Sequence, residues 1–424
     1  MSQDDAETIY REWRRVSDIA DDKKESTSKN GLFPSGRGGH CIVSMPFPTR
    51  TRHLKDRLDD NNNSIALLLG GGDRTGSAFG DVWEMEVMTN DRENKSATLD
   101  ADASNLGRIV WKRARNQDDD HFDIPPRSGA TSVCFESRGV VVIFGGQDPI
   151  SGTCFNDIII LQRHELETVT DVEQSPYYWS WRRSQSPSGS LSPPPRHSHV
   201  CACVSDRLMV LFGGASQTHG LFNDVWVFDI DEETWSLKST SGHIPSSREM
   251  AAAAVISDPS GSHINHVPHG NPSLSSSHDT FAIVIHGGRG EAGVLNDCIM
   301  LSLKDWSWTK LSGEGEAIKQ FSRCAHCAAS MGNNQLVCTS GFNGESICGE
   351  TFVIDVESPT KATFRSLKSI RNNDKVARFA AAGMVLTLPL SCELSDKSSQ
   401  EKKVFAVVGG VTEEEDLADV LILV

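Results

Sequence analysis

Short apolar stretches and glycine pairs alternate along this chain in a fixed order. Each apolar stretch ends at a glycine pair or its equivalent, and an acidic residue that opens a second apolar stretch follows nine to eleven residues later. The glycine positions are Gly71-Gly72, Gly145-Gly146, Gly213-Gly214, Gly287-Gly288, Ser340-Gly341 and Gly409-Gly410. The acidic residues are Asp81, Asp157, Asp224, Asp297, Glu350 and Asp419. Six gaps that agree within two residues predict six copies of one structural unit.

Two further features repeat with the glycine pairs. An arginine precedes every pair, and an aromatic residue follows the acidic residue in five of the six units. The arginines are Arg37, Arg127, Arg196, Arg248, Arg323 and Arg378. The aromatic residues are Trp111, Trp181, Trp235, Trp308 and Phe364. Each unit is therefore predicted to contain four strands, and such sheets bury both faces when they stack radially.

The sixth unit has no aromatic residue after Asp419, whereas the first residues of the chain carry an extra one, Trp13. We expect the segment 9–17 to form the missing fourth strand of the sixth unit. A strand placed there removes the sheet edge that an open ring would expose.

The repeat resembles the Kelch family over essentially the whole chain. The resemblance is carried by the glycine pairs, by the downstream tryptophans and by Asn-Asp pairs that open the third strand. These pairs are Asn156-Asp157, Asn223-Asp224 and Asn296-Asp297. Unit 5 departs from the pattern at Ser340, Glu350 and Phe364. The resemblance implies an all-β fold, a single six-bladed β-propeller over residues 1–424. The expected blades are 37–111, 127–181, 196–235, 248–308, 323–364, and 378–424 together with 9–17.

Polar insertions lengthen several of the predicted hairpins. Segments rich in Ser, Asn, Asp and Lys separate paired strands, and their composition is typical of disorder. We expect disordered insertions at 45–64, 89–107, 258–280 and 391–402, on the face opposite the arginines.

Composition excludes some classes of partner. The net charge is −16 and the pI is near 5.3, which argues against nucleic acid, because phosphates need a basic surface. The first 24 residues are charged and lack the apolar core of a secretory signal, and no apolar window reaches 18 residues. Most of the 11 cysteines lie in predicted strands, so we expect free thiols and a cytoplasmic or nuclear protein without a membrane partner.

The six arginines permit two interpretations. In the first, the arginines lie at the start of the innermost strands, one in each blade. They could then ring the mouth of the channel and bind carboxylates bidentately. The resemblance adds that matching arginines in some Kelch propellers contact acidic or C-terminal peptides. Alternatively each arginine pairs with the acidic residue of its own blade, since both occur six times. For the first interpretation, residues after the glycine pairs would also reach the ligand: Arg74, Gln147, Arg289 and Asn343.

Histidines and cysteines suggest a metal only weakly. His40, His199 and His326 each stand three residues after the arginine, in alternate blades. Three inner strands of a six-bladed ring are too far apart for bonds of about 2.1 Å to one ion. We expect histidines hydrogen-bonded to the backbone instead. The Cys324/Cys327 pair lacks a second pair, so no metal site and no cofactor is predicted.

Function is the least determined property at this stage. The hypothesis is a monomeric protein-interaction module or scaffold without an appended domain, which binds an acidic or carboxylate-bearing protein at the channel mouth. One alternative is a substrate receptor of a ubiquitin ligase. Another is a small-molecule enzyme of the lyase or isomerase type that uses the channel, since a propeller fold does not decide function.

Overall fold

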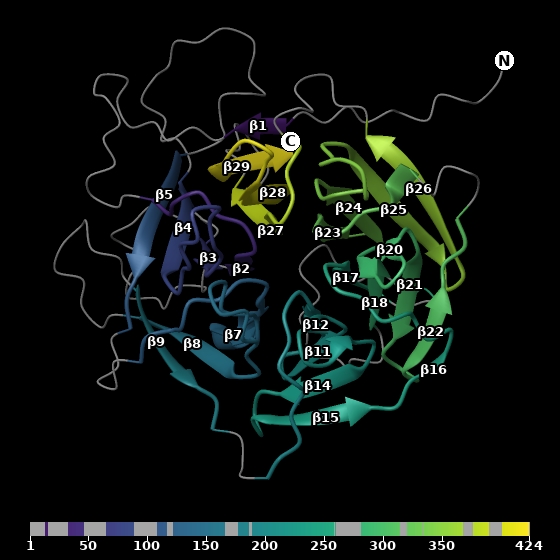
Figure 1. Cartoon of the computed structure of the whole chain (residues 1–424), viewed down its shortest axis with the longest axis horizontal. Helices are drawn as coiled ribbons and strands as arrows, with labels where there is room; N and C mark the ends of the chain where they lie inside the picture. The colour runs from purple at the N-terminus through teal and green to yellow at the C-terminus, as the bar shows by residue number, and fades with distance from the viewer. Residues whose placement is uncertain are drawn as a thin grey trace, which may run out of the picture.

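The computed structural model describes residues 13–15, 33–45, 65–88, 108–116, 122–165, 177–185, 189–257, 259, 281–313, 320–332, 334–367, 376–389 and 401–423. The main strands form six sheets arranged in a ring around a central channel (Figure 1). Among the described residues, no helix is long and apolar enough to cross a membrane. The predicted six-bladed all-β propeller is therefore confirmed.

Each blade contains four strands in the order that the sequence pattern predicted. Blades 1 and 2 are β2 (Cys41–Met45), β3 (Ile65–Leu69), β4 (Val82–Met88) and β5 (Arg108–Ala114), then β6 (Thr131–Phe135), β7 (Val140–Phe144), β8 (Ile158–Glu165) and β9 (Tyr177–Arg183). Blade 3 is β10 (Val200–Cys203), β11 (Leu208–Phe212), β14 (Val225–Asp229) and β15 (Thr234–Lys238). Blade 4 is β17 (Ala252–Ser257), β18 (Phe281–His286), β21 (Cys298–Ser302) and β22 (Ser307–Lys310), with β16 (Ser241–Gly242) added in parallel to β22.

Blades 5 and 6 complete the ring. Blade 5 is β23 (Cys327–Gly332), β24 (Gln335–Thr339), β25 (Thr351–Ser358) and β26 (Lys361–Leu367). Blade 6 combines β27 (Ala382–Pro389), β28 (Glu401–Val411) and β29 (Asp416–Leu423) with β1 (Trp13–Arg15) from the start of the chain. Trp13 pairs with Leu423 and Arg15 with Leu421, in antiparallel register. The predicted closure of blade 6 by the N-terminal strand is thus confirmed (Figure 1).

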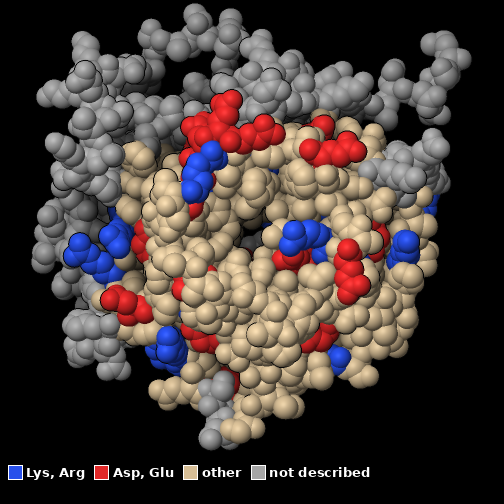
Figure 2. All heavy atoms as spheres, viewed as in Figure 1, with Lys and Arg blue, Asp and Glu red and all other residues tan. Residues whose placement is uncertain are grey.

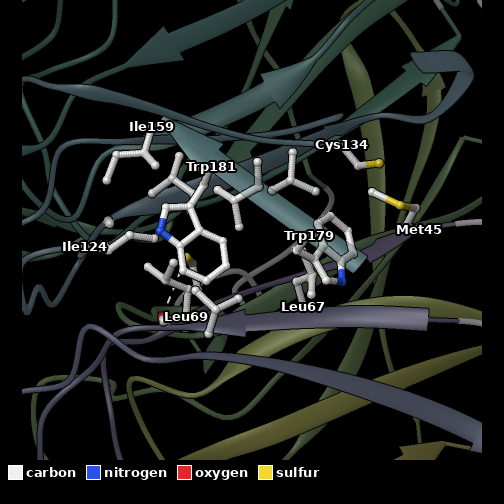
Figure 3. Packing of buried hydrophobic residues seen from close by; sticks show 14 residues of the cluster. Met45, Leu67, Leu69, Ile124, Cys134, Ile159, Trp179 and Trp181 are labelled. Atoms are coloured by element: carbon white, nitrogen blue, oxygen red, sulfur yellow. Dashed lines mark hydrogen bonds between the residues drawn. The ribbon is translucent and has the colours of Figure 1, made fainter. Parts of the chain in front are cut away.

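Six apolar clusters fill the six interfaces between neighbouring blades. Between blades 1 and 2, Trp179 and Trp181 of β9 pack beside Leu67 and Leu69 of β3 (Figure 3). The indole Nε1 of Trp179 donates to Glu84 Oε2 at 2.7 Å, so the polar end of this buried ring is satisfied. The cluster between blades 6 and 1 is equally continuous, so closure of the ring does not depend on β1 alone. Burial on both faces explains why inner strands such as Val140–Phe144 are apolar throughout.

Backbone hydrogen bonds form a closed belt around the channel. The second residue after each arginine donates its N–H to the same position of the preceding blade, at 2.7 to 3.1 Å. The six members are Gly39, Gly129, Ser198, Met250, Ala325 and Ala380. All six have positive φ, between 50° and 67°, although four are not glycine. Because that conformation is unfavourable for a side chain, the belt is a constraint that the packed ring imposes on the chain.

Three boundaries differ from the sequence-based expectation. In blade 1, Gly70 and Gly71 occupy the positions of Gly145 and Gly146, so the pair is one residue earlier than Gly71-Gly72. A run of three glycines made this register ambiguous. Met45 ends β2 and is buried, and β28 begins at Glu401, so the insertions expected at 45–64 and 391–402 are shorter. The rest of those two insertions lies outside the described residues. The same holds for the insertion expected at 89–107 and, except for Pro259, for the one expected at 258–280.

Candidate functional site

The six repeated arginines lie inside their blades. Each guanidinium is almost completely buried and forms an ion pair with the acidic residue of its own blade. The shortest N–O distances are 2.6 Å for Arg37–Asp81, 2.8 Å for Arg127–Asp157, 2.6 Å for Arg196–Asp224, 2.6 Å for Arg248–Asp297, 2.7 Å for Arg323–Glu350 and 2.6 Å for Arg378–Asp419. We call these six pairs the clasps.

Blade 3 shows how a clasp is built. Arg196 donates to both carboxylate oxygens of Asp224, at 2.6 and 2.8 Å, and to the carbonyl of Gly213 at 3.0 Å. Its guanidinium lies 3.9 Å from the centre of the Phe222 ring. Burial by itself would raise the pKa of Asp224, but the hydrogen bond and charge of Arg196 outweigh it and hold that pKa below its usual value.

The clasp arginines also join neighbouring blades. The carbonyl of Arg196 accepts a hydrogen bond from the N–H of Gly146 in blade 2, at 2.9 Å. The same bond recurs at every junction between blades. At the junction of blades 6 and 1, the N–H of Gly410 donates to the carbonyl of Arg37 at 2.9 Å. One residue therefore fixes both the turn of its own blade and the contact with the preceding blade, which explains why the arginine repeats six times.

This geometry decides between the two interpretations of the arginines. All six guanidinium groups are paired with the acidic residue of their own blade and have almost no exposed surface. The six arginines therefore do not form a ring of free guanidinium groups at the channel mouth. Each one pairs with the acidic residue of its own blade, as the second interpretation expected. Sequence spacing could not distinguish the two, because it does not specify the direction of the side chain.

Blade 5 has a weaker clasp. Arg323 makes a single contact with Glu350, at 2.7 Å, and the Glu350 side chain is 64 % exposed. Ser340 replaces the first glycine at φ 66° and donates its hydroxyl to the carbonyl of Val376 at 3.0 Å. The departures from the pattern seen in unit 5 therefore coincide with a locally altered structure.

A cavity of about 470 Å³ lies at one end of the channel. Its wall includes residues from the start of the first strand of every blade, and three loops that follow the glycine pairs contribute the rest. We call the six segments that run from the glycine pair to the clasp acid, between the second and third strands, the mouth loops: 70–81, 145–157, 213–224, 287–297, 340–350 and 409–419. In blade 6 the two ends of this segment belong to β28 and β29. The face that carries them is called the mouth face.

Two positions per blade differ from one blade to the next at this mouth. The residue after each clasp arginine forms a backbone bridge with a residue that follows the glycine pair. From blade 1 to blade 6 these bridges are Gly38/Gly72, Ser128/Gln147, His197/Ala215, Glu249/Arg289, Cys324/Phe342 and Phe379/Val411. Blades 2 to 4 therefore supply mainly polar groups, blades 5 and 6 supply mainly apolar groups, and blade 1 supplies no side chain.

Of the four additional candidates, two line the cavity. Arg74, 37 % exposed, donates to the carbonyls of Thr412 and Glu413 at 2.9 and 3.2 Å and pairs with Asp416, so it links blade 1 to blade 6. Gln147 also lines the cavity. Arg289 is 55 % exposed and pairs with Glu249, whereas Asn343 accepts hydrogen bonds from its own loop, from the N–H groups of Glu345 and Ser346.

Glu249 is a mouth residue that the sequence reasoning missed. Its side chain is 3 % exposed, and its Oε1 accepts hydrogen bonds from Arg289. Its Oε2 lies 3.8 Å from His197 Nδ1 and has no hydrogen-bond partner among the described residues. The signal in the sequence was its position directly after Arg248, where the other blades have no acidic residue.

The histidine series lies between blades. His199 Nε2 shares a 2.8 Å hydrogen bond with Thr131 of blade 2, and His326 Nε2 shares one of 3.1 Å with His286 of blade 4. These partners are side chains, so the expectation of backbone partners was wrong for both. Burial lowers the pKa of His286 to about 4. Among the described residues, no group of three or more His, Cys, Asp or Glu side chains is arranged to hold a metal ion.

The mouth loops are acidic. Once the clasp acids are set aside, they contain eight carboxylates, two arginines and no lysine. The carboxylates are Asp73, Asp148, Glu291, Glu345, Glu413, Glu414, Glu415 and Asp416. Figure 2 likewise shows positive and negative side chains scattered about the central opening, without a ring of positive ones. The positive field expected at the mouth is absent from the described residues.

The fold and the clasps define a class: a six-bladed β-propeller in which each blade is fixed by a buried arginine and an acid. Residues 62–262 match the family model described as the KLHDC2/KLHL20/DRC7 Kelch-repeats domain. This match covers just under half of the chain and identifies Kelch repeats there.

Three curated proteins illustrate the similarity. An F-box/kelch-repeat protein of Arabidopsis thaliana is 29% identical over 206 residues, which cover 48% of this chain and 33% of that protein. Host cell factor 2 of Homo sapiens is 28% identical, over 39% of this chain and 22% of its own length. Acyl-CoA-binding domain-containing protein 4 of Arabidopsis thaliana is 24% identical, over 66% and 42%. The chain therefore spans less than half of the length of each of these relatives.

Proposed function

We propose that this propeller is a protein-interaction module and that its partner docks on the mouth face. The observation that carries the proposal is the contrast between repeated and non-repeated positions. The clasps and the belt recur in all six blades because the architecture requires them. The paired positions at the mouth differ in every blade, so the architecture does not dictate them, and such positions are free to specify a ligand.

The shape and exposure of the mouth support the same proposal. Its cavity has the size of typical ligand pockets, roughly 300–1,000 Å³. Ile150, on the β7–β8 mouth loop, is 78 % exposed, the most exposed large apolar side chain among the described residues. An exposed apolar residue beside a cavity is a suitable anchor for a protein partner.

The charge of the partner needs to be reconsidered. The hypothesis of an acidic partner depended on six free arginines, and these are paired. Arg74 and Arg289 are the arginines of the mouth loops, and both are already engaged by carboxylates. The proposal therefore keeps the protein partner and the mouth face, and it no longer includes an acidic ligand.

Affinity capture with two matched variants tests the docking face. Ile150→Asp places a charge on the mouth face, and Leu237→Asp places one on β15, at the outer edge of blade 3 (Figure 1). Both residues are exposed, so both variants should fold. We expect partners captured from lysate to be lost with Ile150→Asp and retained with Leu237→Asp. The reverse pattern would place the partner on the outer edge and refute the proposal.

A ubiquitin-ligase substrate receptor is the second candidate function. The observation in its favour is that one relative is named an F-box/kelch-repeat protein. Cullin and adaptor subunits in the captured material would support it, and their absence beside a captured partner would favour the plain interaction module. For the compartment we propose cytosol or nucleus, because the ten described cysteines are free thiols.

A further inference from the structure

The mouth face carries a charge that is independent of the architecture. The clasp acids are neutralised by their arginines. The mouth loops contain eight other carboxylates but only two arginines and no lysine. Three of them, Glu413, Glu414 and Glu415, are consecutive and exposed at the β28–β29 loop of blade 6. We call these three residues the crest. Their carboxylates have no ion-pair partner in the part of the chain that the structure describes.

The crest leads directly into the cavity. Asp416, the next residue, lines the cavity and is held by the backbone N–H of Arg74 at 2.9 Å. Because this contact uses Asp416 Oδ2, the other oxygen, Oδ1, is left buried without a hydrogen-bond partner among the described residues. A ligand that crosses the crest would therefore meet a further acceptor at the cavity wall.

Glu249 supplies a second unsatisfied acceptor. It is almost completely buried on blade 4, and its Oε2 has no donor in the described structure, while His197 beside it lines the cavity. Burial lowers the pKa of His197, with the charge of Glu249 opposing the shift, so a neutral imidazole faces this carboxylate at pH 7. Buried carboxylate oxygens are normally hydrogen-bonded, and charged N–H donors bind them most strongly.

We infer, on the basis of the proposed function, that the partner presents a basic segment to this mouth. Lysine or arginine side chains of that segment pair with the crest, and one of them enters the cavity toward Asp416 and toward His197, which lies beside Glu249. The cavity, of about 470 Å³, has room for a long side chain. Nucleic acid does not satisfy this chemistry, because its phosphates would be repelled by the same carboxylates.

The test is a binding titration of the full chain with two labelled octapeptides. One peptide alternates lysine with serine, and the other alternates glutamate with serine. Fluorescence anisotropy at low and high salt gives the affinities. We expect the lysine peptide to bind, to weaken as salt rises, and to lose roughly tenfold in affinity with Glu413→Gln/Glu414→Gln/Glu415→Gln. Glu249→Gln should weaken it further, and the β signal in circular dichroism checks that this variant is folded.

A matched control removes the same charge elsewhere. Glu232 and Asp305 are exposed on the turns between third and fourth strands, and Glu357 is exposed near the end of β25, so all three lie away from the mouth face. Glu232→Gln/Asp305→Asn/Glu357→Gln therefore gives the same net charge as the crest variant. We expect this control to bind within about twofold of the unmodified protein. Equal losses in both variants, tighter binding of the glutamate peptide, or no binding of the lysine peptide would each overturn the inference.

The two proposals fail separately. If a captured partner is lost with Ile150→Asp while the lysine peptide does not bind, the interaction module stands and the basic segment is refuted. If the lysine peptide binds the crest but captured partners are indifferent to Ile150→Asp, the docking face for the natural partner is refuted.

Discussion

The clasp of blade 3 offers a direct test of how the repeat is stabilised. Asp224→Asn removes one charge and keeps the shape, which leaves the guanidinium of Arg196 buried without a counter-charge. Two charge-assisted hydrogen bonds, at 2.6 and 2.8 Å, are weakened or lost. At about 1.5–3 kcal/mol each they would total roughly 3–6 kcal/mol. The Asp224 side chain is 26 % exposed, so solvent screens part of this, and we expect a loss of about 3 kcal/mol.

Blade 5 provides the matched comparison. Glu350→Gln makes the same acid-to-amide change in a clasp with one contact and a 64 % exposed acid. We expect a loss of about 1 kcal/mol or less, because exposed ion pairs contribute little.

Urea titrations monitored by tryptophan fluorescence measure the free energy of unfolding of both variants. The comparison tests the reasoning because blade position and chemistry are matched while burial differs. A loss below about 1 kcal/mol for Asp224→Asn, or equal losses for the two variants, would refute the claim that the buried clasps stabilise the blades.

Three other predictions concern stability. Burial acts to raise the pKa values of Asp81 and Asp224, but Arg37 and Arg196 outweigh it and hold both below their usual 3.8. Their contribution to stability is therefore present at neutral pH and lost as the pH falls below about 4, and urea titrations at pH 6 and pH 3 should show a smaller loss on acidification for Asp224→Asn than for the unmodified chain. Deleting residues 1–20 removes β1 and exposes the edge of β29, so we expect a melting temperature lowered by several degrees and self-association in size-exclusion chromatography; an unchanged, monomeric protein would contradict this. Replacing residues 46–64, 261–280 and 391–400 with short turns should preserve the β signal in circular dichroism, because long surface insertions add little to a hairpin, whereas loss of expression would argue that they support the fold.

Much of the fold could be predicted from local pattern. Apolar stretches such as Val140–Phe144 and Leu208–Phe212 became the second strands of blades 2 and 3. The extra aromatic residue Trp13 correctly indicated the closing strand. The register in blade 1 failed because three consecutive glycines fit the same pattern in two ways.

The site was less predictable. Arg74 was predicted to bind a ligand, and nothing in the sequence indicated that it also fastens blade 1 to blade 6, through carbonyls that lie more than 300 residues later in the chain. Glu249 was overlooked because its environment is formed by Arg289 and His197, on its own and the preceding blade. Such contacts depend on how blades stack, and a one-dimensional repeat does not encode them visibly.

The sequence by itself determined the number of blades, the order of their strands and the closure of the ring. These properties follow from the spacing of apolar runs and glycines, which acts locally and repeats six times. Only the tertiary structure decided the direction of the clasp arginines, because a residue that begins an inner strand can point toward the channel or into its blade. It likewise decided the charge of the mouth, since burying six arginines leaves the unpaired carboxylates of the mouth loops to set the field there.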